Sequence, residues 1–385
     1  MDGVTRWTAW VAAGVWVAAA ACGSPGHAGR FAAAPAATPA DVDATLFLIG
    51  DAGAPAPDSE PVLAALRTAT AAAINPVVVF LGDNVYPHGL PDSAHPERPE
   101  AERRLEAQLG VLAATGADGI FVPGNHDWDR QGADGWDAVR RQEAFVDSWP
   151  RARVDYLPGG GCPGPVALDL GSRVRIVVLD TQWWLHEGAK PVDPTSPCPA
   201  DSESEVRDSL RAVLRAAGDR RVVVVAHHPL ESGGPHGGHF DWKAHVFPLR
   251  DLKRWLWVPL PIIGSVYPVA RQLGVSNQDA ASGAYRRMRA ALEDAFRDHP
   301  PLVYASGHDH SLQVIAGGGA RHLLVSGAGT YGHRSRVAWR DSTRFAASAS
   351  GFMRLEILRN GRVRLGISVV EATGRAAEAF SMWLQ

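Results

Sequence analysis

Five short loops of the sequence carry side chains that bind metals, each where an apolar run ends. They read Gly50-Asp51-Ala52-Gly53, Gly82-Asp83-Asn84-Val85-Tyr86, Gly124-Asn125-His126-Asp127, Ala226-His227-His228-Pro229 and Gly307-His308-Asp309-His310. Carboxylate and amide oxygens, imidazole nitrogens and a phenol together suit first-row transition metals. A single Asp after a strand is usually part of a turn, and a single His is usually a structural residue whose polar atoms are hydrogen-bonded. The prediction therefore rests on the whole set. The donors suffice for two ions, which a shared carboxylate holds about 3.5–4 Å apart in two-metal hydrolases.

The apolar runs before these loops are expected to be buried strands that bring the loops together. They are short and rich in Val, Leu and Ile, and cover residues 46–50, 76–81, 119–122, 221–226 and 302–305, with a further strand at 174–179. Helices are predicted at 61–73, 100–114, 203–217 and 283–297. Open α/β sheets place their sites beyond the carboxyl ends of the strands, so the loops should meet at one edge.

The helical pattern stops after residue 313. Segments 322–326, 337–339, 352–358 and 362–369 predict antiparallel strands, with Asn360-Gly361 as a type I′ hairpin turn. Alternating strands and helices before a β-rich end indicate an α/β (α+β) fold, with a central sandwich of two mixed sheets flanked by helices. One domain over residues 44–385 is the simplest organisation.

The order of the five loops resembles that of the calcineurin-like metallophosphoesterases. Within this superfamily they are similar to the motifs of the purple acid phosphatases, with the small tartrate-resistant branch nearest. The matching residues are Asp51-x-Gly53, Gly82-Asp83-x-x-Tyr86, Gly124-Asn125-His126, Val224-x-x-His227 and Gly307-His308-x-His310. The resemblance covers about residues 45–330 and breaks at an insertion near 240–282. It implies the four-layer metallophosphoesterase fold and a phosphoric ester hydrolase.

The resemblance also assigns the metal ligands, which are Asp51, Asp83, Tyr86, Asn125, His227, His308 and His310. Asp83 would bridge a first ion on Asp51, Tyr86 and His310 to a second ion on the other three. Most of the superfamily has a His two residues after the first Asp, where this chain has Gly53. The Tyr86 phenol would take that place. A phenol has a pKa of about 10 and binds a trivalent ion best as phenolate, so the expected cofactors are Fe(III) and a divalent Zn, Fe or Mn ion.

The same resemblance predicts hydrolysis of phosphate monoesters by attack of a metal-bound hydroxide. His126 is the expected proton donor to the leaving group, and Asp127 a carboxylate that orients it. His236, nine residues after His227, is expected beside the site. Two alternatives stay open: a phosphodiesterase acting on nucleotides or phospholipids with the same metal core, and a non-catalytic envelope protein that uses the fold for binding.

The amino terminus predicts export. Arg6 precedes an apolar run over residues 7–21, and Cys22 follows three alanines, which resembles a bacterial lipobox. Residues 1–22 are therefore predicted as a signal peptide with a lipid-modified Cys22, and residues 23–43 as a flexible Ala/Pro-rich tether. The expected location is the bacterial cell envelope, periplasmic or at the outer surface, with ordinary secretion as the alternative. Cys162 and Cys198 could pair in an exported protein or stay free.

An apolar stretch lies within the insertion. Residues 255–270 read WLWVPLPIIGSVYPVA, with basic residues on both sides. Three prolines make it too broken, and 16 residues too short, for a spanning helix. It could be an interfacial segment at a membrane, a lid over the site, or part of the core.

The net charge of −3 gives no basic field for nucleic acid. The expected partners are a phosphorylated small molecule or lipid, and a membrane surface touched through 255–270.

Overall fold

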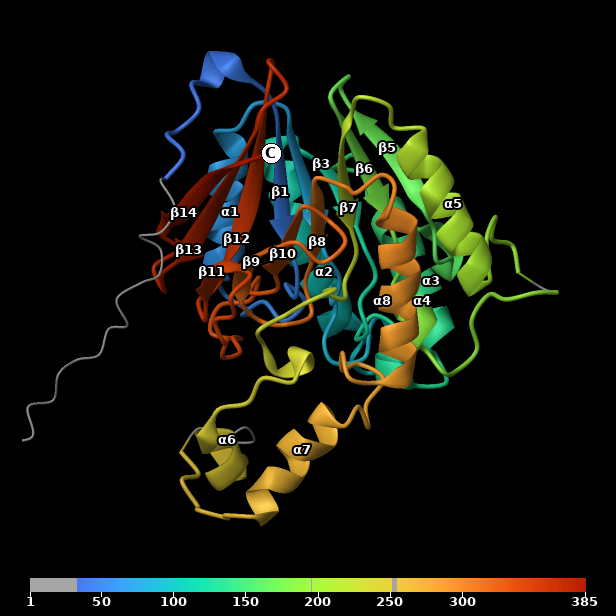
Figure 1. Cartoon of the computed structure of the whole chain (residues 1–385), viewed down its shortest axis with the longest axis vertical. Coiled ribbons are helices and arrows are strands. Elements are labelled where there is room, and N and C mark those ends of the chain that lie inside the picture. The colour runs from blue at the N-terminus through green and yellow to red at the C-terminus, as the bar shows by residue number, and fades with distance from the viewer. Residues whose placement is uncertain (1–32, 195, 251–254) are drawn as a thin grey trace, which may run out of the picture.

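In the computed structural model, residues 33–194, 196–250 and 255–385 are described, and their strands form two seven-stranded sheets packed face to face (Figure 1). From edge to edge, the first sheet contains β14 (Ala376–Leu384), β13 (Val363–Val370), β12 (Gly351–Leu358), β1 (Val42–Ile49), β2 (Pro76–Phe80), β3 (Asp118–Phe121) and β4 (Val154–Tyr156). The second contains β11 (Thr343–Ala347), β9 (Leu312–Ala316), β10 (His322–Ser326), β8 (Val303–Ser306), β7 (Arg221–Val225), β6 (Val174–Val178) and β5 (Val166–Leu170). Both sheets mix parallel and antiparallel pairs. The predicted signal peptide and Cys22 lie outside the described residues.

The helices form two outer layers because the central strands are apolar on both faces. In β1, Leu46 and Leu48 pack in the core between the sheets, while Phe47 and Ile49 pack outward under helices. The first sheet is covered by α1 (Pro61–Ala71), α2 (Arg98–Thr115) and α3 (Gly135–Asp147); the second is covered by α4 (Gln182–Leu185), α5 (Glu203–Arg215) and α8 (Gly283–Phe296). The predicted fold, a sandwich of two mixed sheets flanked by helices, is confirmed.

The carboxyl-terminal strands differ in detail from the prediction. Residues 337–339 form no strand; Ala338 N donates a single hydrogen bond to Gly233 O, and the strand in this region is β11. At the β12–β13 hairpin only Gly361 has a positive φ, 84°, and its N–H donates to Leu358 O. The turn is therefore a tight turn closed by a left-handed glycine, and the predicted type I′ turn is wrong, because that type needs two such residues.

The tether predicted over residues 23–43 is too long at its carboxyl end. Ala34 is buried, and its carbonyl accepts hydrogen bonds from Arg364 Nη2 at 3.0 Å and Ser381 Oγ at 2.9 Å. The buried Arg364 guanidinium also pairs with Glu356 and Glu378. The folded body thus includes Ala34, which packs against β13 and β14.

Residues 240–282 leave the sandwich as an excursion that carries α6 (Trp242–Val246) and α7 (Val266–Gln272), seen below the sheets in Figure 1. Most of the large apolar residues over 255–270 are exposed; Ile262, for example, keeps 86% of its surface accessible. The alternative in which 255–270 packs into the core is therefore wrong. Within the described part of the chain, no helix combines the length and the apolar character needed to span a bilayer.

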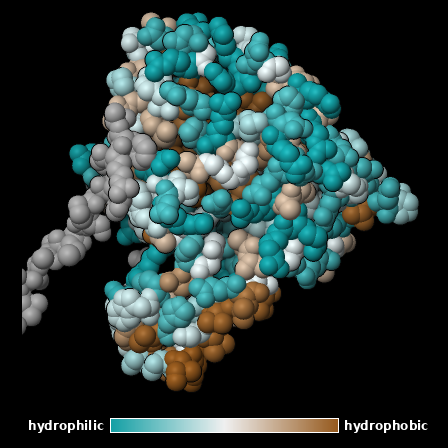
Figure 2. All heavy atoms as spheres, viewed as in Figure 1, coloured by the Kyte–Doolittle hydropathy of each residue, from teal (hydrophilic) through white to brown (hydrophobic). Residues whose placement is uncertain are grey.

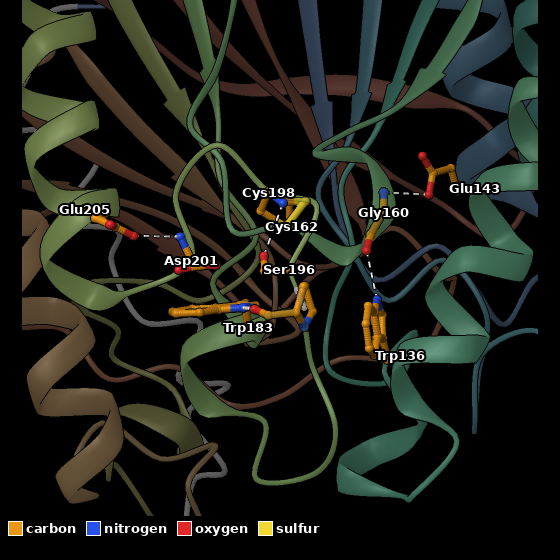
Figure 3. Close-up of a disulfide and its surroundings, with 10 residues drawn as sticks. Trp136, Glu143, Gly160, Cys162, Trp183, Ser196, Cys198, Asp201 and Glu205 are labelled. Atoms are coloured by element: carbon orange, nitrogen blue, oxygen red, sulfur yellow. Dashed lines mark hydrogen bonds between the residues drawn. A yellow bond between two sulfur atoms is a disulfide. The ribbon is translucent and has the colours of Figure 1, made fainter. Parts of the chain in front are cut away.

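Cys162 and Cys198 form a disulfide that joins the loop after β4 to the loop before α5 (Figure 3). The first loop is also fixed by α3, since Trp136 Nε1 donates to Gly160 O at 2.8 Å and Gly160 N donates to Glu143 at 2.7 Å. The bond therefore connects the edge of the first sheet to the helical layer over the second.

Replacing Cys198 by Ser is expected to lower the free energy of unfolding by about 3–4 kcal/mol, because the bond closes a loop of 36 residues in the unfolded chain. Denaturant titration of the two proteins measures the difference. Reduced wild type serves as the control and should match the variant. Equal midpoints for oxidised wild type and variant would show that the bond adds no stability.

Candidate metal centre

The loops that carry the predicted ligands meet across the two sheets. Asp51 follows β1, Asp83 follows β2, and His308 follows β8, and each has a left-handed backbone with φ of 59°, 55° and 69°. Such backbone angles are unfavourable for residues with a side chain and collect at functional sites. All three strained residues lie at strand ends, and their side chains belong to the two clusters described next.

One cluster of side chains surrounds the phenol of Tyr86. Its Oη lies 3.0 Å from Asp51 Oδ1, 3.0 Å from Asp83 Oδ2 and 3.2 Å from His310 Nε2. His310 Nε2 is also 3.3 Å from Asp51 Oδ1. These four groups are the ones predicted to hold the first ion.

A second cluster lies on the other side of Asp83. Asn125 Oδ1 is 3.1 Å from His227 Nε2 and 2.9 Å from His308 Nδ1, and these two nitrogens are 3.2 Å apart. Asp83 Oδ1 lies 3.4 Å from His227 Nε2. Asp83 thus turns one oxygen to each cluster, which is the arrangement expected of a bridging carboxylate.

The protonation of the two imidazoles fits a cation between them. His227 Nδ1 donates to Leu81 O at 2.8 Å, and His308 Nε2 donates to Gln278 O at 2.9 Å. In a neutral imidazole that donates in this way, the other ring nitrogen carries the lone pair, so these hydrogen bonds turn one possible metal-binding nitrogen of each ring toward the other. Atoms that each lie about 2.1 Å from one ion are about 3.0–3.4 Å apart, which matches the separations in both clusters. The chain's residues therefore fit two ions.

The pKa values depend on burial and on the neighbouring charges. Burial, followed by the charges of Asp51 and Asp83, raises the pKa of the Tyr86 phenol well above its usual value. Burial also raises the pKa of Asp83, but the charges of His227 and His126 outweigh it and hold that pKa below its usual range. The protein by itself therefore keeps Tyr86 protonated, and only a strongly charged cation would make it a phenolate.

Gly53 leaves no space for a further ligand. A Cβ at this position would lie 2.4 Å from the carbonyl carbon of Asn84 and 2.5 Å from Asp83 O. A His here would displace the loop that carries Asp83. The absence of this His and the presence of Tyr86 in the first cluster are thus linked by packing.

His126 lies at the edge of the first cluster. Its Nδ1 donates to Pro87 O at 2.7 Å, and its Nε2 is 3.9 Å from Asp83 Oδ2. Its ring contacts that of Tyr86 at a tilt of 49°, with 4.2 Å between centroids. Burial lowers the pKa of this imidazole, against the opposing charge of Asp83. The free Nε2 faces the site without replacing a ligand.

Asp127 does not orient His126, and that prediction is wrong. Its fully buried carboxylate accepts hydrogen bonds from the backbone N–H groups of Asn84, Val85 and Gly124. The side chain therefore ties together the loops after β2 and β3, and acts on the site by holding Asp83 and Asn125 in place.

His236 lies beside the second cluster, with its ring centroid 3.8 Å from that of His308. Its Nδ1 is 3.0 Å from Gln278 O and 3.1 Å from Asp279 Oδ1. His228 is buried next to His227, and its ligand atoms also lie within 4.8 Å of those of His227 and His308. Both of its ring nitrogens are engaged, however, by Thr181 Oγ1 and Gln278 Oε1. His228 is a wall residue.

Two residues near the site were not predicted. The ring of His333 lies 3.9 Å from that of His310, and its Nδ1 is buried without a hydrogen-bond partner. It lies in the loop after β10, which ends at Ser326, too far from the strand end for the pattern of ligands at strand ends to mark it. Gln278 contacts three imidazoles through its carbonyl and side chain, but it lies in the insertion, where no pattern marks it.

A pocket of about 860 Å³ opens over the site. His236, His310 and His333 line it on the metal side, and Lys243, Phe247, Tyr267 and Arg271 of the excursion line it on the other. Arg130 and Arg334 add positive charge, whereas Arg336 is ion-paired with Asp241 in the same wall. An anionic group can therefore reach the clusters through a basic entrance.

Comparisons with known proteins agree with this description. A family model described as calcineurin-like phosphoesterase matches residues 44–312. Among solved structures, similar folds occur in GAP50, the anchor in the inner membrane complex of Plasmodium (15% identity, TM-score 0.56, 89% of this chain and 88% of that one), and in PhoD (13%, 0.52, 89% and 69%). The purple acid phosphatase PPD1 from yellow lupin seeds has 13% identity and a TM-score of 0.51; 88% of this chain aligns with 53% of that one. No curated protein sequence matches.

Proposed function

Because the chain belongs to the calcineurin-like phosphoesterase family, which makes it a phosphoric ester hydrolase, we propose that it hydrolyses phosphate monoesters at a two-metal centre of the purple acid phosphatase type. The observation that carries this proposal is the position of Tyr86, whose hydroxyl lies 3.0 Å from both Asp51 and Asp83. Two buried carboxylates beside a phenol repel each other when no cation lies between them, and they oppose ionisation of the phenol. A bound cation removes both effects.

The ligands suggest which ions are held. Asp51, Tyr86 and His310 with the shared Asp83 would hold Fe(III), and Asn125, His227 and His308 a divalent Zn, Fe or Mn ion. When bound, these ions activate water and neutralise charge on the phosphoryl oxygens.

The chain's own groups position the ester and move a proton. The basic residues of the pocket would bind the phosphate and the rest of the substrate, which orients the scissile bond. His126 presents Nε2 at the rim of the first cluster, while Pro87 O fixes its other nitrogen. We infer that His126 protonates the leaving oxygen, and that His236 contacts the phosphate from the side of the second cluster.

The proposal is tested by metal analysis of the purified chain together with a substrate panel. Two ions per chain, one of them iron, and faster turnover of monoesters than of diesters are expected. Preference for phosphodiesters such as nucleotides or phospholipids would favour the alternative activity on the same centre. A chain that binds both ions and hydrolyses neither class would instead indicate a binding protein.

Replacing His126 by Ala should separate substrates by their leaving groups. For alkyl phosphates, kcat/KM is expected to fall by about 10²–10⁴-fold, the usual contribution of a general acid. For p-nitrophenyl phosphate, whose leaving group needs no proton, the loss should be far smaller. His88→Ala, at an exposed imidazole paired with Asp129, is the matched control. Equal losses on both substrates would contradict the proton-donor role.

We further propose that the protein is exported and anchored in the cell envelope by a lipid on Cys22, with secretion as the alternative. The lipobox-like sequence supports this, and so does the disulfide, since such bonds form in oxidising compartments. Metabolic labelling with a fatty-acid analogue tests it: label on the wild type but not on Cys22→Ser is expected, and label on neither protein would refute the anchor.

A further inference from the structure

The excursion ends in an exposed apolar surface, the apolar tip, made of Trp255, Trp257, Ile262, Ile263, Val266 and Tyr267. Each of these side chains is between 52% and 86% exposed. Figure 2 shows hydrophobic residues gathered over the lobe that carries α7, whereas the rest of that face is largely hydrophilic. Contiguous apolar patches of this kind mark sites of contact with another apolar phase.

The charge of the excursion identifies that phase. The excursion, residues 240–282, contains five Lys or Arg and three Asp, so it is net positive although the whole chain has a net charge of −3. A second copy of the chain would present the same positive lobe and be repelled. Aromatic residues around an aliphatic centre, beside basic residues, are typical of segments that lie in the headgroup region of an anionic bilayer.

The excursion is also connected to the metal centre. Arg271 of α7 forms an ion pair with the buried Asp279 and places Nη2 2.8 Å from His236 Nδ1. Next to Asp279, Gln278 O accepts the hydrogen bond of His308. Tyr267 belongs both to the apolar tip and to the pocket wall, where its hydroxyl accepts a hydrogen bond from Arg271 at 2.7 Å. A body resting on its apolar tip therefore has the basic pocket near the lipid surface.

We propose that the apolar tip docks on an anionic phospholipid bilayer and that the pocket takes phosphate esters presented at that surface, the substrate class being phosphorylated amphiphiles. Docking does not depend on the proposed phosphatase activity; the substrate class rests on it.

Docking is tested by hydrogen–deuterium exchange of the full chain with and without vesicles that contain phosphatidylglycerol. Exchange is measured for each segment separately, so membrane binding through a lipid on Cys22 does not by itself protect the excursion. With vesicles, uptake over 255–275 should fall by about half or more, because the headgroup region excludes water, while α5 stays unchanged. Equal uptake with and without vesicles overturns docking. Protection that appears without vesicles as protein concentration rises would indicate self-association and also overturn it.

A double substitution, Ile262→Asp with Ile263→Asp, gives an independent test. Binding to these vesicles should weaken by about tenfold or more for each residue, whereas Val192→Asp, at an exposed apolar residue between α4 and α5, should have no effect. Activity on a soluble monoester should persist in all three proteins. If the double variant also loses activity on a vesicle-borne phosphate monoester, the substrate class is supported; if that activity is unchanged, it is refuted. If the wild type itself does not hydrolyse a soluble monoester, the phosphatase function is refuted instead.

Discussion

Replacing Tyr86 by Phe is expected to abolish the visible absorption band of the iron-loaded protein. The phenol oxygen lies at the centre of the first cluster, 3.0–3.2 Å from three other donors, and a tyrosinate on Fe(III) is what would give the colour. Phe keeps the ring that contacts His126 and removes only the oxygen. Loss of this donor from the first ion should lower kcat/KM by about 10²-fold or more, since metal charge contributes several kcal/mol to such reactions.

The measurement is an absorption spectrum with metal analysis on the same sample. Tyr331→Phe, at a tyrosine outside both clusters, is the matched control and should keep band and iron. An unchanged band in Tyr86→Phe would refute phenolate ligation. A wild type that binds only divalent ions, with no band, would refute Fe(III) in the first cluster while leaving the two-metal centre intact.

Replacing Asp83 by Ala should have the largest effect on metal content, because this carboxylate turns one oxygen to each cluster. Its two oxygens lie 3.0 Å from Tyr86 Oη and 3.4 Å from His227 Nε2. We expect both ions to bind weakly and activity to fall by about 10³-fold or more, as several kcal/mol of electrostatic stabilisation are lost.

Asn125→Ala provides the contrast, since this residue touches only the second cluster. It should retain iron and lose the divalent ion. Asp92→Ala, at an exposed carboxylate, controls for the loss of one negative charge. Circular dichroism checks that each variant is folded. Retention of both ions by Asp83→Ala would contradict a bridging role.

The parts of the site that depend on strand ends could be predicted from sequence. Asp51, Asp83, Asn125, His227 and His308 each follow a buried apolar strand, and the topology of parallel strands brings such positions to one edge. The direction of a side chain within a loop could not be predicted. His126 and Asp127 are adjacent, yet His126 faces the first cluster, whereas the carboxylate of Asp127 is buried and accepts hydrogen bonds from three backbone N–H groups.

Strands such as β2 and β7 could be predicted because they are continuous apolar runs buried on both faces, whereas a strand with exposed residues gives a weaker signal. β14 begins with four exposed residues, so it lacks the alternation that identifies a half-buried strand. Val337 and Trp339 are strand-forming residues, but the backbone between them bonds to a loop, through Ala338 N and Gly233 O, and β-propensity depends on the neighbouring strand. The position of Gln278 depends on how the excursion returns to the sandwich, which no local pattern encodes.

Because Ala34 packs against the last strands, it limits the length of chain that could link a lipid on Cys22 to the folded body. Only 12 residue steps separate the two positions, and a fully extended chain spans about 3.5 Å per residue, so the folded body would stay within roughly 40 Å of the lipid. At this range the apolar tip would meet the bilayer at a high effective concentration. Even a weak affinity of the excursion for lipid would then be enough to fix the orientation of the enzyme on the membrane.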